Sequence, residues 1–263
     1  MDPKSNNLFF IDSHCHLPLL KESTPVVIEK CASLSVLTIL NVGFDVESSL
    51  QSVQLAKTYP AIDASIGIHP HYAAGSLLET LEWMEMEIGK KYIVAIGEIG
   101  LDTVRSKTSL SAQIEWFEAQ LALAEKYDLP VIIHNREADH EIETVLLRYK
   151  KVRGVLHCFS SGIEFASKML SMGWFLSFSG NCTYPKNEIM RNVIQQMPSD
   201  RLLLETDAPY LTPLPFRGIQ ENSPIFMPDI YDFTARVRSE NKSKLMDQIA
   251  KNYFLLFNRN RVV

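Results

Sequence analysis

Residues 8–16, LFFIDSHCH, join a short apolar run to two histidines. If residues 8–12 form a strand, His14 and His16 leave its carboxyl end on the same side, because side chains two apart in a strand share a face. Two neutral imidazoles side by side suit a transition-metal ion. A pair of buried, hydrogen-bonded histidines is the alternative, so the ends of the other strands decide between the two interpretations.

Seven more apolar runs follow along the chain, each short and rich in Val, Ile, Leu or Phe. Such runs are typical of strands buried on both faces of a parallel sheet. Beyond residues 8–12, they are residues 36–42, 63–68, 93–98, 130–134, 154–159, 174–179 and 202–207. The sequence therefore predicts eight strands.

Helix-like segments separate several of these runs. In residues 109–128, Ile114, Phe117 and Leu121 follow the three-to-four spacing of one helix face. Further segments of this kind are residues 79–88, 138–149, 164–172 and 244–257. Eight strands alternating with helices over about 250 residues favour an α/β fold, the (β/α)8 TIM barrel, as a single domain of residues 1–263. A doubly wound open sheet is the alternative.

The chain is acidic, with a formal net charge of −5, and 46% of its residues are hydrophobic. It lacks the basic excess of proteins that hold nucleic acid non-specifically, so any polyanion should bind at a local cationic site. The first ten residues carry no secretory signal, no apolar run is long enough to span a membrane, and the four cysteines form no CxxC pair. We expect a cytoplasmic protein with reduced thiols.

Ligand-type side chains gather where the predicted strands end. Six of the seven histidines fall there, and only His140 lies in a predicted helix, where we expect it on the surface. In a (β/α)8 barrel the carboxyl ends of the strands carry the catalytic residues. The side chains concerned are His14, His16, His69, His71, Glu98, Asp102, His134, His157, Glu205 and Asp207. Their shared position predicts one metal-binding active site.

This mixture of imidazoles and carboxylates suits two divalent metal ions about 3.5–4 Å apart, which can clamp a phosphoryl group and activate a water. We expect Glu98 to bridge the two ions. His14 and His16 would hold one ion with Asp207, and His134 and His157 would hold the other. Asp207 is also the expected base that orients and deprotonates the attacking water, although capping a helix before Pro209 is its alternative role.

Other residues are expected to contact the substrate. His71 is a candidate contact for a substrate anion, whereas His69, fixed before Pro70, is expected to pack or hydrogen-bond locally. Arg136 could pair with a carboxylate or a phosphate. Arg217 is the better phosphate candidate, because loops after the last strands of this fold often bind phosphate.

Supporting roles are expected for four residues near the ligands. Glu205 could hydrogen-bond a histidine ligand, and Asp102 could anchor a neighbour or cap the next segment. Cys15 lies between His14 and His16, and Cys158 follows His157. Because neighbouring side chains in a strand alternate, both cysteines should point away from the site and pack.

Six motifs, in order along the chain, resemble those of the TatD-like metal-dependent hydrolases. They are D-x-H-x-H (12–16), G-x-H-P-H (67–71), G-E-I-G-L-D (97–102), P-V-I-I-H-x-R-x-A (130–138), H-C-F-S-G (from 157) and E-T-D-x-P-Y-L (205–211). The resemblance implies a (β/α)8 barrel with divalent metals, such as Mg, Mn or Zn, held by the six ligand residues proposed above. It also implies phosphodiester hydrolysis with DNA as substrate, typically as a deoxyribonuclease or 3′→5′ exonuclease.

The chain departs from the family pattern at three places. The motif after residue 157 carries an extra serine, Ser161, and Thr103 and Val104 stand where the family often has aromatic residues. The late loop, residues 217–224, lacks a lysine of the family pattern and has one residue more. The resemblance therefore supports the metal site more strongly than the substrate contacts.

Two other functions remain open from the sequence. The first is hydrolysis of an amide or ester at a carbonyl centre, including deacylation of D-aminoacyl-tRNA. Many two-metal amidohydrolases bridge their ions with a modified lysine. Here Glu98 stands at the expected bridging position, and Lys90 and Lys91 lie at the opposite end of the strand, which favours a phosphoester substrate. The second is a metal-dependent scaffold without catalysis, which the complete set of ligands disfavours. We expect a monomer with no membrane contact.

Overall fold

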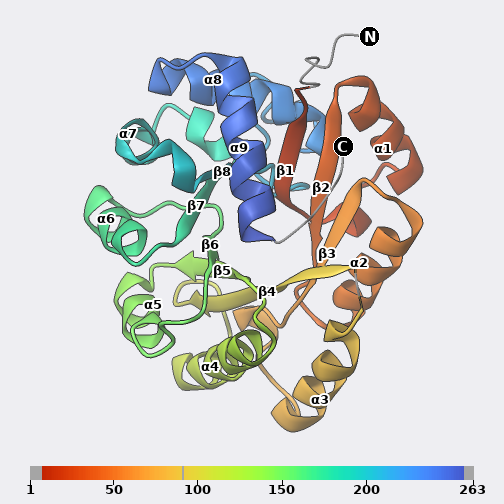
Figure 1. Ribbon diagram of the computed structural model, residues 1–263, viewed down its shortest axis with the longest axis vertical. Helices are drawn as coiled ribbons and strands as arrows, with labels where there is room; N and C mark the ends of the chain where they lie inside the picture. The colour runs from red at the N-terminus through yellow and green to blue at the C-terminus, as the bar shows by residue number, and fades with distance from the viewer. Residues whose placement is uncertain (1–7, 91, 258–263) are drawn as a thin grey trace.

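Eight parallel strands form one sheet in the order in which they occur along the chain (Figure 1). The computed structural model describes residues 8–90 and 92–257. The strands are β1 (Phe10–Cys15), β2 (Val36–Val42), β3 (Ile62–Ile66), β4 (Ile93–Asp102), β5 (Val131–Arg136), β6 (Gly154–Leu156), β7 (Phe175–Phe178) and β8 (Leu202–Leu204). The eight predicted strands are confirmed, with ends that shift by up to four residues.

The sheet closes where β8 meets β1. Cys15 and Ala208 form a parallel bridge, and the N–H of Asp207 donates to the carbonyl oxygen of His14 at 2.9 Å. The predicted TIM barrel is therefore confirmed, and the doubly wound open sheet is wrong. Closure brings residues 12–16 against residues 205–208, although some 190 residues separate them in the chain.

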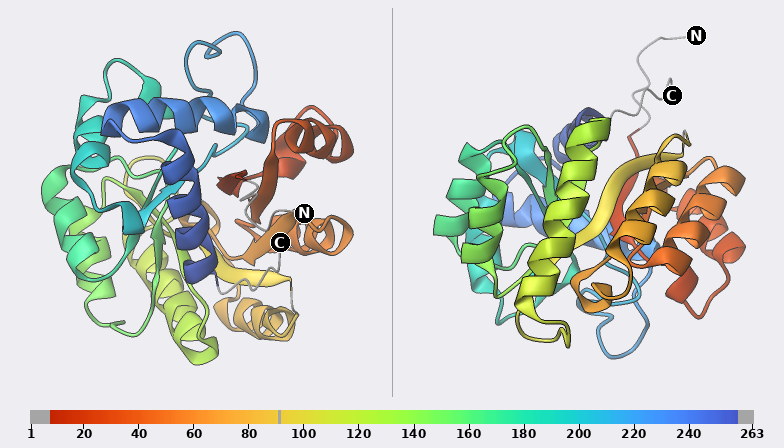
Figure 2. Two further views of the ribbon diagram at one scale, coloured as in Figure 1. Left: turned by 45° about the horizontal axis from the view of Figure 1, so that its top comes forward. Right: turned by 90° about the horizontal axis from the view of Figure 1, so that it is seen from below.

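Helices surround the barrel (Figure 2). They are α1 (Thr24–Ser33), α2 (Val46–Thr58), α3 (Leu77–Ile88), α4 (Leu110–Tyr127), α5 (Asp139–Leu146), α6 (Ile163–Ser171), α7 (Glu188–Gln196), α8 (Met227–Arg238) and α9 (Lys242–Leu256). The five predicted helices are confirmed as α3, α4, α5, α6 and α9. The described residues form a single domain, as predicted; residues 1–7, 91 and 258–263 of the predicted domain lie outside them.

Helix α4 shows how local sequence sets an element. The Ser109 hydroxyl accepts a hydrogen bond from the N–H of Ala112, which satisfies one of the free donors of the first turn. Phe117 and Leu121 are buried on the helix face turned toward the barrel. The helix ends at Asp128, whose φ of 51° is the left-handed conformation typical of a helix terminus.

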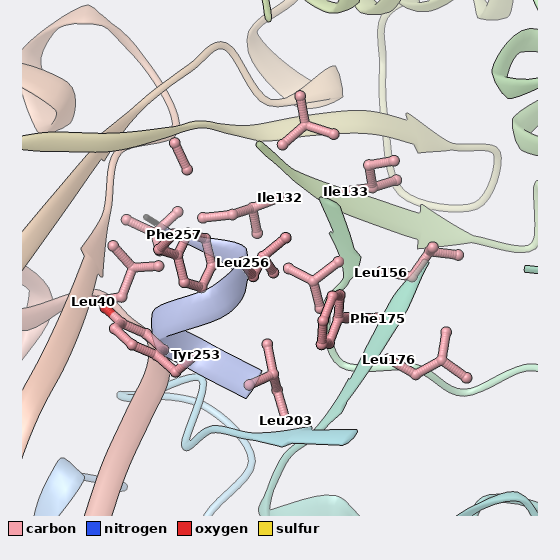
Figure 3. Close-up of a cluster of buried hydrophobic side chains, with 14 of the residues drawn as sticks. Leu40, Ile132, Ile133, Leu156, Phe175, Leu176, Leu203, Tyr253, Leu256 and Phe257 are labelled. Atoms are coloured by element: carbon pink, nitrogen blue, oxygen red, sulfur yellow. The ribbon is translucent and has the colours of Figure 1, made fainter. Parts of the chain in front are cut away.

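Helix α9 covers the amino end of the barrel. Figure 3 shows Tyr253 and Leu256 of this helix, and Phe257 just after it, among side chains of the strands, including Leu40, Ile132 and Leu203. The Tyr253 hydroxyl bonds Asp63 near the start of β3 at 2.8 Å. Because these side chains fill the amino end of the described barrel, we expect the functional site at its carboxyl end.

No described helix is long and apolar enough to span a membrane. The loop after β8 projects from the end of the barrel opposite α9, as the right-hand view of Figure 2 shows. The predicted lack of a secretory signal concerns residues 1–10, of which residues 1–7 lie outside the described part of the chain.

Candidate metal centre and active site

The six predicted ligand residues lie together at the carboxyl end of the barrel. They come from five strands or the loops that follow them: His14 within β1 and His16 just after it, Glu98 within β4, His134 within β5, His157 after β6 and Asp207 after β8. Their donor atoms form overlapping groups whose members lie within 4.8 Å of one another. Residues that are far apart in the sequence thus meet in one polar cluster above an apolar core.

A first group of donor atoms surrounds one side of the Glu98 carboxylate. The Nε2 atoms of His14 and His16 lie 3.2 Å apart, and each lies 3.8 Å from Asp207 Oδ1. Glu98 Oε2 lies 3.5 Å from the first of these nitrogens and 3.8 Å from the second. Donors around a tetrahedral zinc are roughly 3.3–3.6 Å apart, given bonds of about 2.0–2.2 Å. The spacing of this group is close to that of a metal site.

A second group faces the other oxygen of Glu98. Glu98 Oε1 lies 2.8 Å from His157 Nε2 and 2.9 Å from His134 Nδ1. The two imidazole nitrogens are 3.5 Å apart. Because each carboxylate oxygen of Glu98 faces a different set of nitrogens, this residue lies between the two groups.

His69 belongs to the second group, which the sequence did not predict. Its Nε2 lies 3.5 Å from Glu98 Oε1, and its ring is buried. The expected local hydrogen bond is also present, because His69 Nδ1 accepts from the N–H of His71 at 3.1 Å. The proximity of His69 to Glu98 depends on the turn at Pro70, whose geometry a spacing pattern does not reveal.

His71 turns away from the metal groups toward Asp102. Its Nε2 lies 2.8 Å from Asp102 Oδ2, which is also 3.5 Å from His134 Nε2. The other oxygen of Asp102 accepts hydrogen bonds from the N–H groups of Val104 and Arg105. Although burial opposes ionisation of Asp102, these hydrogen bonds lower the pKa of its carboxyl. Asp102 therefore both anchors His134 and organises the loop that follows β4.

The tautomers imposed by the surroundings direct nitrogen lone pairs into the cluster. His16 Nδ1 lies 2.9 Å from the carbonyl oxygen of Val42, so it must donate there, and its Nε2 is left as an acceptor. His157 Nδ1 faces Glu205 Oε1 at 3.3 Å, and its Nε2 then points a lone pair at the Glu98 carboxylate. Two acceptors 2.8 Å apart need a proton between them or a cation beside them to which both bind. The donor set therefore fits divalent metal ions.

The ionisation of the cluster follows from this crowding. Although burial opposes ionisation of Glu98, the imidazoles of His157 and His69 hold the pKa of its carboxyl well below the usual range. Burial likewise works against the charged form of His157, but Glu98 and Glu205 raise its pKa well above the ordinary value. Burial raises the pKa of the Asp207 carboxyl, and the charges of Glu205 and Glu98 add to this effect.

Asp12 ties the two ends of the barrel sheet together beneath the cluster. Its Oδ1 accepts from the N–H groups of His14 and Thr206, at 3.3 and 2.9 Å, and its Oδ2 accepts from the Thr206 hydroxyl. Burial raises the pKa of Asp12 to about 7. The residue was predicted only as part of a motif, and its position shows that it holds His14 against β8.

The two cysteines next to histidines behave differently. Cys15 is buried and packs in the core, as predicted. The prediction that Cys158 packs away from the site is wrong, because its side chain lines the cavity. Its φ of 45° breaks the strand alternation on which the prediction depended. Its N–H donates to Glu205 Oε1 at 2.7 Å, so this turn also holds the carboxylate that faces His157.

A cavity of about 740 Å³ opens over the cluster. His71 and Arg136, both predicted to contact substrate, line it, and so does Arg105. Arg217 is not among the lining residues: its guanidinium lies 4.0 Å from the ring centroid of Tyr184, which does line the cavity. Arg217 therefore does not line the cavity, where the expected contact with a phosphate would be made.

Two residues that the sequence singled out, His140 and Ser161, lie outside the cluster. His140 lies exposed on α5, as predicted. The extra serine after residue 157, Ser161, donates a hydrogen bond from its hydroxyl to Asp139 Oδ1 at 2.7 Å. This added residue thus ties the loop after β6 to the start of α5 and leaves the metal groups intact.

Comparison with known proteins agrees with the geometry of the site. A family model described as TatD related DNase matches residues 11–258. The chain is 35% identical to an uncharacterized metal-dependent hydrolase, YabD, of Bacillus subtilis, over 95% of this chain and 99% of that protein. It is 34% identical to a protein of Erwinia tasmaniensis named 3′-5′ ssDNA/RNA exonuclease TatD, over 88% of this chain and 92% of that protein.

A solved structure shows the same similarity in three dimensions. The crystal structure of YjjV, a TatD homologue from Escherichia coli, superposes with a TM-score of 0.89 and 30% identity, covering 95% of this chain and 98% of that one. The family model, these relatives and the cluster at the barrel end agree. The chain belongs to the TatD family of metal-dependent hydrolases.

Proposed function

We propose that this protein is a phosphodiesterase that uses two divalent metal ions to shorten DNA from its 3′ end. The observation that carries the proposal is the position of Glu98, whose Oε2 lies 3.5 Å from His14 Nε2 and whose Oε1 lies 2.8 Å from His157 Nε2. The name of the Erwinia tasmaniensis relative supports the choice of nucleic acid as substrate.

The residues of each group have distinct roles in this proposal. His14, His16 and Asp207 would hold one ion, and His134 and His157, with His69 beside them, would hold the other. Glu98 would bridge the two. Bound divalent ions supply charge neutralisation on the phosphate and a lowered pKa for water.

Asp207 is the proposed base. Its side chain lines the cavity, and its Oδ1 lies 3.8 Å from both His14 Nε2 and His16 Nε2. A carboxylate at this position is within reach of an attacking water in the cavity and can accept its proton. His71, Arg136 and Arg105 line the same cavity and would contact phosphate oxygens, because imidazole and guanidinium groups donate hydrogen bonds to phosphate.

A carbonyl substrate, such as an amide or a D-aminoacyl ester, is less well supported. A carboxylate, Glu98, lies between the donor groups, and Lys90 instead pairs with Glu87 before β4 begins. Lys91 lies outside the described residues. These positions favour the phosphoester reaction over one that needs a lysine between the ions.

We also propose that the protein acts as a monomer in the cytoplasm. One chain supplies every residue of the cluster, so no second copy is needed to complete it. The four cysteines are free, and three of them are buried, which suits a reducing compartment. Light scattering on the pure protein would check the first point: a stable dimer would contradict it.

The test is a strand-length assay with metal-depleted protein and single-stranded DNA labelled at its 5′ end. Adding Mg, Mn or Zn should produce a ladder of progressively shorter labelled products. The Asp207→Asn variant, which keeps the side-chain shape, should be slower by about 10²–10⁴-fold because the base is lost. No shortening with any metal, or equal shortening by the variant, would reject the proposal.

A further inference from the structure

The rim of the cavity is divided into two unlike halves. Because the strands follow one another around the barrel, the loop after each strand has a known place on the rim. The loops after β8, β1, β2 and β3 contribute Tyr210, Leu19, Phe44 and Tyr72 to the cavity wall. We call these four side chains the apolar arc. They occupy neighbouring positions, so they form one continuous side of the opening.

Two rings of the apolar arc, Phe44 and Tyr210, lie next to His16 of the first donor group, and Tyr72 lies next to Phe44. The ring centroid of Phe44 lies 5.5 Å from that of Tyr72 and 5.3 Å from that of His16. The Tyr210 ring lies 6.4 Å from His16 on another side. Tyr72 is 49% exposed and Tyr210 54% exposed, so each offers a π surface close to the donor group.

The backbone holds the apolar arc in a fixed relation to the proposed ligands. The carbonyl oxygen of Phe44 accepts from the N–H of His69 at 2.9 Å, and the N–H of Tyr72 donates to the carbonyl oxygen of His69 at 2.8 Å. The N–H of Tyr210 donates to the carbonyl oxygen of Asp207, also at 2.9 Å. A ligand on these rings would thus be positioned relative to the cluster with little ordering of the protein.

The other half of the rim carries the arginines of the cavity wall, together with the carboxylate of Glu137 and the ring of Tyr184. Arg105 follows β4, Arg136 ends β5, and Asn181 follows β7. A single nucleic acid strand needs both kinds of surface: π faces on which bases stack and cations along the phosphates. The two halves of the rim supply them on opposite sides of the donor groups.

From this arrangement we propose that the apolar arc is the subsite for the base of the 3′-terminal nucleotide. The inference rests on the proposed function and adds where the substrate lies. The terminal base stacks on Tyr72 and Tyr210, its phosphate lies at the donor groups, and the rest of the strand passes toward Arg105 and Arg136. Stacking tolerates any base, so the subsite should accept all four bases but disfavour a terminal residue that has none.

The test measures binding, so that it does not depend on catalysis. Two single-stranded hexanucleotides carry a 5′ fluorophore and a phosphorothioate at the last linkage to slow hydrolysis. One ends in thymidine and the other in an abasic tetrahydrofuran residue. Fluorescence anisotropy with the metal-loaded protein at a fixed salt concentration gives the Kd of each. We expect the abasic end to weaken binding by about 10-fold, as loss of one stacked base would.

Variants of the exposed rings separate stacking from a general effect. Tyr72→Leu and Tyr210→Leu should each reduce the difference between the two oligonucleotides to about 3-fold or less, because each removes one π surface. Both side chains are about half exposed, so the fold should tolerate the changes. Tyr127→Leu is the matched control, since Tyr127 is 38% exposed at the end of α4 and does not line the cavity.

Three outcomes would overturn the proposed subsite: equal affinities of the unaltered protein for the two oligonucleotides, binding of neither, or a full difference retained in both tyrosine variants. Failure of the nuclease function gives a different result, because it appears as absence of shortening in the strand-length assay. A protein that prefers the base-bearing end but shortens no DNA would support the subsite and reject the nuclease.

Discussion

Glu98 lies at the centre of the candidate metal site. The residue is 4% exposed, yet its carboxylate lies among five imidazoles. The imidazoles of His157 and His69 hold the pKa of this carboxyl low. Each oxygen faces a different donor group, at 3.5 Å from His14 Nε2 on one side and 2.8 Å from His157 Nε2 on the other. Buried negative charge of this kind persists only where cations or hydrogen-bond donors compensate it.

The first prediction concerns Glu98→Gln. The amide has nearly the same shape but lacks the charge, and its nitrogen, unlike the carboxylate oxygen that it replaces, cannot bind a metal ion. We expect metal content, measured by elemental analysis, to fall from two ions per chain to one or fewer, and activity to fall by at least about 10²-fold. Glu115→Gln, an exposed change on α4, is the control and should leave both unchanged. Two ions retained by Glu98→Gln would contradict the bridging role.

The second prediction concerns Glu205→Gln. Glu205 Oε1 lies 3.3 Å from His157 Nδ1, and its charge raises the basicity of that ring. Losing the charge should weaken metal affinity by about 10–100-fold, as is typical for carboxylates behind a histidine ligand. Titration with Mn while following its EPR signal measures the affinity. Recovery of full activity at saturating metal is expected, and unchanged affinity would show that Glu205 does not act through His157.

At the scale of elements, strand ends were predictable and several helices were not. A buried strand appears in the sequence as a short apolar run, and the candidate ligand residues lie at or just after the ends of these runs. Helix α2 buries Ser48, Ser49 and Ser52 against the sheet, so its inner face lacks the apolar spacing that reveals α4. The position of His69 depends on the turn that begins at Pro70, and that of Cys158 on its left-handed backbone conformation. Periodicity detects neither.

The third prediction tests the role of α9 as cover of the amino end. Leu256 is 1% exposed and lies among strand residues in Figure 3, whereas its neighbour Leu255 is 65% exposed. Leu256→Ala should lower the free energy of unfolding by about 2–5 kcal/mol through lost burial and a cavity. Leu255→Ala should change it by less than about 0.5 kcal/mol. Urea denaturation compares the two, and equal effects would show that α9 does not seal the barrel.

For the whole molecule, metal binding and stability are expected to be linked. The cluster joins β1, β4 and β5 with the loops after β6 and β8, so an ion held there would connect distant parts of the chain. It would also offset the repulsion between Glu98, Asp207 and Glu205 in a protein whose net charge is already −5. The proposed polyanionic substrate would meet local positive charge despite the acidic composition, because Arg105 and Arg136 line the cavity.

The fourth prediction follows from this linkage. Removing metal with a chelator should lower the melting temperature by about 5–10 °C, since a ligand at about 100 times its Kd adds about 2.7 kcal/mol. Differential scanning calorimetry before and after dialysis against the chelator measures the change, and adding Mn should restore it. The Glu98→Gln protein should respond less. A melting temperature that is the same with and without chelator would argue against tightly held ions.

The most direct measurement of the central claim is anomalous X-ray diffraction from crystals of the Mn-loaded protein. Two anomalous peaks about 3.5–4 Å apart, one beside His14 and His16 and the other beside His134 and His157, with the Glu98 carboxylate between them, are the predicted result. A single peak, or two peaks that do not share Glu98, would contradict the account.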